Sequence, residues 1–129
     1  MNDAQRALPP LLAAFGAGQI LLGALLWLTP GFFFEQIGPY GERNDHYMAD
    51  VASFYLALGV VALVAVRRAS WRVPVLAFSV LQYALHSLNH LIDVDEADPG
   101  WLGPVNLASL ALTAALLGWL LARQGEAGR

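Results

Sequence analysis

The chain has 129 residues, of which 57% are hydrophobic and only 13% are charged. Soluble domains carry about 25% charged residues, so this composition predicts an integral membrane protein. The chain contains no cysteine, which excludes disulfides and thiolate metal sites. Every basic residue is an arginine, the formal net charge is −3, and no basic stripe is present, so we expect no nucleic-acid binding.

Four apolar segments each approach the roughly 20 residues that a helix needs to span a bilayer. In chain order, they cover residues 8–29, 47–66, 73–92 and 101–122. Short connections between apolar helices favour neighbours that run up and down. The sequence therefore predicts an all-α fold, an integral membrane four-helix bundle with up-down connections, as a single domain over residues 1–129.

The first segment has the signals of a retained helix. Pro9 and Pro10 are expected in its first turn, where a missing amide donor does no harm. Thr29-Pro30-Gly31 is expected to end it. The next residues, PGFFFEQ, offer no small-residue cleavage site, so we expect no signal peptide. Phe32, Phe33 and Phe34 then predict a re-entrant segment or a short surface helix.

The other three segments also have clear boundaries. Asn44 or Asp45 can cap the second helix. Pro74 falls in the first turn of the third helix, where it is tolerated. The turn signal Asp98-Pro99-Gly100 precedes the fourth helix. Small residues spaced for close helix contact occur in three pairs: Ala14 with Gly18, Ala111 with Ala115, and Ala114 with Gly118.

Loop charges predict an orientation. The turn between the second and third helices carries Arg67, Arg68 and Arg72 and no acid, whereas the other two connections are acidic. The positive-inside rule then places this turn and both termini in the cytoplasm. We expect a multi-pass protein of the cell (inner) membrane, with the acidic loops at the outer face.

A polar stripe runs along the third helix, where residues 79–93 read SVLQYALHSLNHLID. At 100° per residue, Gln82, His86, Asn89 and Asp93 fall within about 60° of one another, and His90 extends the stripe. The opposite face of this helix is apolar. Ionisable groups on one side of a membrane helix mark a candidate functional site.

The predicted topology brings a His/Asp pair of the second helix close to this stripe. His46 and Asp50 are spaced i, i+4 at the outer end of the second helix, as are His86 and His90 on the third. Three imidazoles and one carboxylate suit zinc, copper(II) or non-haem iron, whereas two histidines on one helix fit haem less well. The predicted second-shell or ligand-lining residues are Gln82, Asn89, Asp93, Asn106, Ser109 and Gln19.

Three functions stay open. The first is an outward-facing His/Asp site for a metal ion or a small ligand, in a redox, sensing or transport-accessory role. The second is an accessory or structural subunit whose polar stripe stabilises helix packing, a partner interface or a homo-oligomer. The third is a lipid- or quinone-active enzyme that uses His86 or His90 as a general base. The lipid bilayer is the expected environment in each case.

Two segments carry a family resemblance. They are LTPGFFFEQIG, at the end of the first helix, and DVASFYLALGVVAL, which leads to the arginine turn. With these segments, the chain resembles the small bacterial four-helix membrane proteins of the DoxX-like group and their uncharacterised relatives. The resemblance implies the fold and the membrane location, and it carries no activity over.

Overall fold

The computed structural model describes residues 3–127, and these form helices and loops without a β-strand. The elements are α1 (Asp3–Leu28), α2 (Pro30–Gln36), α3 (Asp45–Arg67), the 3₁₀ turn η1 (Ala69–Trp71), α4 (Arg72–Ile92) and α5 (Leu102–Ala127). The all-α prediction and the four long helices are confirmed. The phenylalanine-rich segment forms the short helix α2.

Each of the four long helices is apolar and long enough to cross a membrane. Large apolar side chains are exposed along their outer faces, among them Leu21, Val60, Leu81, Leu85 and Leu112. A bilayer matches such a surface, since lipid tails are as apolar as leucine. The fold is therefore that of a multi-pass membrane protein.

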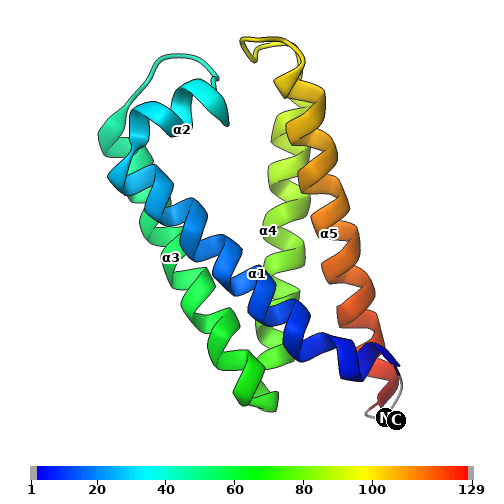
Figure 1. The fold of residues 1–129 in the computed structure, drawn as a ribbon. Coiled ribbons are helices and arrows are strands. Elements are labelled where there is room, and N and C mark those ends of the chain that lie inside the picture. Colours follow the sequence, from blue (N-terminus) through cyan, green and yellow to red (C-terminus); the bar gives the residue numbers. More distant parts are fainter. Residues whose placement is uncertain (1–2, 128–129) are drawn as a thin grey trace.

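The long helices form two pairs. α1 packs along α3, and α4 packs along α5, whereas contacts between the pairs are fewer. Figure 1 shows the pairs meeting near the turn that joins α3 to α4 and diverging toward the end that carries α2. We call these the closed end and the open end of the bundle.

Glycines allow α1 and α3 to approach closely. A Cβ added at Gly59 would lie 2.8 Å from the carbonyl oxygen of Gly16, and one added at Gly16 would lie 2.9 Å from that of Gly59. The small-residue pairs predicted from sequence spacing do not lie at this contact between α1 and α3. Within the described residues, a Cβ at Gly18 or Gly118 would meet no atom within 4 Å. Spacing alone cannot identify the face that turns toward a neighbouring helix.

The start of α1 differs from the prediction. The helix begins at Asp3, so Pro9 and Pro10 lie inside it rather than in its first turn. Each proline lacks an amide hydrogen and therefore removes one intrahelical hydrogen bond. Prolines are a common cause of helix kinks, and Figure 1 shows α1 changing direction near this end.

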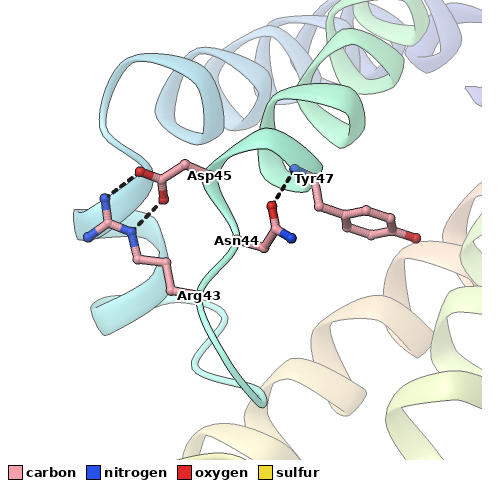
Figure 2. A network of polar contacts seen from close by, with 4 residues as sticks. All are labelled: Arg43, Asn44, Asp45 and Tyr47. Atoms are coloured by element: carbon pink, nitrogen blue, oxygen red, sulfur yellow. Dashed lines mark hydrogen bonds and ion pairs between the residues drawn. The ribbon is translucent and has the colours of Figure 1, made fainter.

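The start of α3 is held by local polar contacts, which Figure 2 shows. Asn44 caps the helix, because its side-chain oxygen accepts a hydrogen bond of 3.0 Å from the backbone N–H of Tyr47. Arg43 donates to both carboxylate oxygens of Asp45, at 2.6 and 2.9 Å. This hydrogen bonding raises the pKa of the Arg43 guanidinium. The contacts are exposed, so they orient the loop more than they stabilise the fold.

The closed end is both packed and capped. Leu8, Leu12, Leu76 and Leu120 are completely or almost completely buried and join the two helix pairs in one core. Arg72, at the start of α4, donates at 3.2 Å to two carbonyl oxygens near the end of α3. The last carbonyls of a helix have no partner within that helix, so this arginine satisfies two of them.

Candidate functional site

A cavity of about 300 Å³ lies between the two helix pairs at the open end. Seven wall residues are apolar or glycine: Leu22, Leu26, Phe33, Ile37, Gly38, Val51 and Leu110. Six are polar: Tyr40, Tyr55, His86, His90, Asn106 and Ser109. A concave, mainly apolar wall with a few polar groups is typical of small-molecule sites, and this volume is at the lower end of their range.

Tyr40 is at the centre of a hydrogen-bonded group at the polar part of this wall. Its hydroxyl lies 3.1 Å from Nδ1 of His90, and the two rings meet edge to face at 4.8 Å. The Asn106 amide donates to the carbonyl oxygen of Ile37 at 2.8 Å and lies 3.5 Å from the Tyr40 hydroxyl. These contacts join the loop after α2 to both α4 and α5.

At the open end of the bundle, backbone contacts join the two loops above the cavity. Tyr40 forms an antiparallel bridge with Ala97, in the loop between α4 and α5. The backbone N–H of Asp98 donates to the carbonyl oxygen of Pro39 at 3.3 Å. The loop of one helix pair is therefore tied to the loop of the other, although the helices themselves diverge there.

Two polar groups on the wall have unused hydrogen-bonding capacity. Nδ1 of His86 is buried and has no hydrogen-bond partner among the described residues. The Tyr55 hydroxyl has no hydrogen bond within residues 3–127 either. The unpaired Nδ1 of His86 costs free energy because it is buried, whereas the Tyr55 hydroxyl is not fully buried, so a bound molecule could supply its missing partner. The Tyr55 hydroxyl and the His86 ring, which both line the cavity, are thus candidates for ligand contact.

The four predicted metal ligands do not come together. His86 and His90 are neighbours, with ring centroids 4.9 Å apart, and both line the cavity. His46 and Asp50 pair with each other at 3.7 Å, and their side chains are 89% and 67% exposed. Within the described part of the chain, no group of three or more His, Cys, Asp or Glu side chains can hold a metal ion.

The helical period explains why His46 and Asp50 are elsewhere. Tyr55 marks the face of α3 that turns inward. At 100° per residue, His46 lies about 180° and Asp50 about 140° around the helix from Tyr55. The i, i+4 spacing places the two residues together, but on the wrong face of α3 for a shared site.

The predicted supporting residues also separate. Gln82, Asn89 and Asp93 are not part of the cavity wall, and within residues 3–127 none of their side chains is hydrogen-bonded to the imidazole of His86 or His90. The observed partner of His90 is Tyr40, which sequence reasoning did not find.

Gln19 has a separate role below the cavity. It is 3% exposed, and its amide donates to the Tyr83 hydroxyl at 2.7 Å. Tyr83 lies on α4 about one turn from His86, toward the closed end. The hydrogen bond joins α1 to α4, so Gln19 contributes to helix packing and not to the cavity wall.

The predicted residues of α5 do reach the cavity. Asn106 and Ser109 both line it, and Ser109 also donates to the backbone carbonyl of Asn106 at 2.8 Å. Tyr40 and Tyr55, which sequence reasoning missed, complete the polar part. Tyr55 lies in the middle of an apolar segment and Tyr40 in a loop, so neither belongs to a polar pattern that could have identified it.

Comparison of the chain with protein-family models, with curated proteins and with solved structures found no match. The resemblance to the DoxX-like group therefore stays a prediction, and the function is argued from the cavity.

Proposed function

We propose that this membrane protein binds a small, largely apolar molecule in the cavity between its two helix pairs. The observation that carries the proposal is the cavity wall itself, which combines seven apolar or glycine positions with six polar side chains. An apolar body would contact the leucines, and a hydrogen-bonding group would contact the polar part. A bilayer concentrates molecules of this kind beside the protein.

The wall chemistry supports an organic ligand over a metal ion. Only two imidazoles are adjacent there, and the wall has no carboxylate to complete a set of ligands. A zinc site generally takes four ligands, or three with an open position. The unused polar groups are instead spread around an apolar space, as in sites for small molecules.

In the test, the three histidines report on binding through their NMR signals. The protein is labelled with ¹³C at the histidine Cε1 atoms, and the three signals are followed in micelles while eight-carbon probe molecules are added. We expect saturable shifts of the His86 and His90 signals. The His46 signal should stay unchanged, because its side chain is 89% exposed on another face.

Two tryptophan variants make the test specific. Leu22 lines the cavity, whereas its neighbour Leu21 is 61% exposed on the outer surface. Leu22→Trp should fill the cavity and abolish the shifts, and Leu21→Trp should preserve them. If no probe gives a saturable shift, or if both variants bind equally, the cavity is not a binding site. The histidines would then serve tertiary contacts alone, as His90 already does with Tyr40 in the loop after α2.

We also propose that the turn between α3 and α4 faces the cytoplasm. The support is the loop charge: this turn carries arginines and no acid, whereas the loop between α4 and α5 carries four acids and no base. The cavity at the open end would then face the outer side of the membrane. The N-terminal end of α1 and the C-terminal end of α5 would then lie in the cytoplasm.

Single cysteines can test this orientation, because the chain has none of its own. Ser70→Cys lies in the arginine turn and Asp95→Cys in the acidic loop, and both positions are exposed. On intact cells, a membrane-impermeant maleimide should label the Asp95→Cys variant only. Labelling of Ser70→Cys should require permeabilised cells, and the opposite pattern would reverse the orientation.

A further inference from the structure

The charge and hydrogen-bonding capacity of the cavity wall narrow the class of molecule that it can hold. We propose that the cavity selects an uncharged molecule with a carbonyl or hydroxyl group over an acid or an amine of the same length. This inference rests on the proposed function, because it specifies the ligand of the same cavity.

Charge is the first argument. None of the wall residues is Asp, Glu, Lys or Arg. A bound cation would therefore find no carboxylate, and a bound carboxylate would find no guanidinium or ammonium group. A charged group moved from water into an apolar site is costly unless it is paired. A cation on His86 would also lie beside the second imidazole, whose ring centroid is 4.9 Å away.

Hydrogen-bonding capacity is the second argument. His90 and Asn106 are already engaged with the loop after α2, His90 through Tyr40 and Asn106 chiefly through the carbonyl of Ile37. The Tyr55 hydroxyl and the His86 imidazole have no described hydrogen bond within residues 3–127. A phenol offers one O–H donor, and a neutral imidazole offers one donor and one acceptor. A carbonyl oxygen accepts from these donors, and a hydroxyl group both accepts and donates.

Size is the third argument. A water molecule takes a share of about 30 Å³ in the liquid, so the cavity corresponds to roughly ten such volumes. A chain of eight carbons with one polar group has a comparable number of non-hydrogen atoms. It would fill the cavity with its polar group at the wall and its apolar chain among the leucines.

The experiment compares five eight-carbon probes that differ only in their polar group: 2-octanone, 1-octanol, octanoate, octylammonium and octane. Each is titrated into the histidine-labelled protein in micelles, and the His86 signal reports the apparent affinity. We expect saturable binding of 2-octanone and 1-octanol, at least tenfold tighter than that of the two charged probes. Octane should bind more weakly than the ketone, because it leaves the polar wall groups without partners.

Tyr55→Phe tests the named contact. Removal of this hydroxyl should weaken 2-octanone binding roughly three- to tenfold, as expected for one hydrogen bond. It should not weaken octane binding, because octane makes no hydrogen bond to this hydroxyl. If octanoate or octylammonium binds as tightly as the ketone, the proposed ligand class is wrong although the cavity is a site. If none of the five probes binds, the proposed function itself fails.

Discussion

Tyr40 is the residue on which most of the polar wall depends. Its hydroxyl contacts His90 on α4 and lies within reach of the Asn106 amide on α5, while its backbone pairs with Ala97. One side chain therefore orients a histidine of the cavity and ties two loops together. An imidazole held in this way has a defined ring orientation, which a ligand site requires.

Tyr40→Phe should destabilise the protein by roughly 1 kcal/mol, the net contribution of a typical hydrogen bond. The free energy of unfolding in mixed micelles measures this change, and the ¹³C signal of His90 should shift. Tyr47→Phe is the matched control, because Tyr47 is 69% exposed and its side chain has no described hydrogen bond. Equal effects of the two substitutions would show that the Tyr40 hydroxyl contributes nothing to the fold.

The helices α1 and α3 form the more closely packed of the two helix pairs. Gly16, Gly23 and Gly59 lie where the two helices touch, and a Cβ at Gly59 would come within 2.6 Å of an Ile20 side-chain carbon. In a bilayer, helices associate through such close packing rather than through the hydrophobic effect. The glycines therefore set the distance between these helices.

Gly59→Ala should destabilise the α1–α3 contact by roughly 1–3 kcal/mol, as overpacking of a tight site usually does. Gly18→Ala is the control on α1, since a Cβ there meets no described atom within 4 Å. The control should be neutral or slightly stabilising, because alanine favours a helix more than glycine does. Thermal unfolding in micelles measures both variants, and a stable Gly59→Ala protein would contradict the packing argument.

At the scale of the whole molecule, the two helix pairs are joined differently at their two ends. The closed end has a leucine core with Arg72 as a cap, whereas loop contacts join the pairs above a cavity at the open end. Under the proposed function, stability and ligand binding would depend on opposite ends of the bundle. We expect substitutions in the leucine core of the closed end to change stability more than substitutions in the cavity wall, which should chiefly change binding.

Leu76→Ala tests the first half of this separation. Leu76 is completely buried in the core that joins the pairs. Its truncation should cost roughly 1–3 kcal/mol, less than in a soluble core, because lipid is as apolar as leucine and mainly packing is lost. Leu81→Ala should lower the free energy of unfolding little, because Leu81 is 60% exposed. Similar unfolding free energies for the two variants would show that the core does not hold the pairs together.

The sequence by itself determined the four long helices, their approximate ends and the apolar face of α4. These properties follow from local rules: segment length, residue hydropathy, proline and asparagine at the ends, and a fixed angle of 100° per residue. The same period correctly separated the polar side of α4 from Leu81, Leu85 and Leu88, which are exposed.

Only the tertiary structure decided which polar residues meet. The rotation of each helix about its axis follows from packing, and the glycine contact between α1 and α3 turns His46 and Asp50 away from the cavity. Tyr40 reaches His90 from a loop, and a loop has no regular repeat from which the position of a side chain could be predicted. A helix face is a local property of the chain, whereas a binding site depends on the angles and distances between helices, which packing sets.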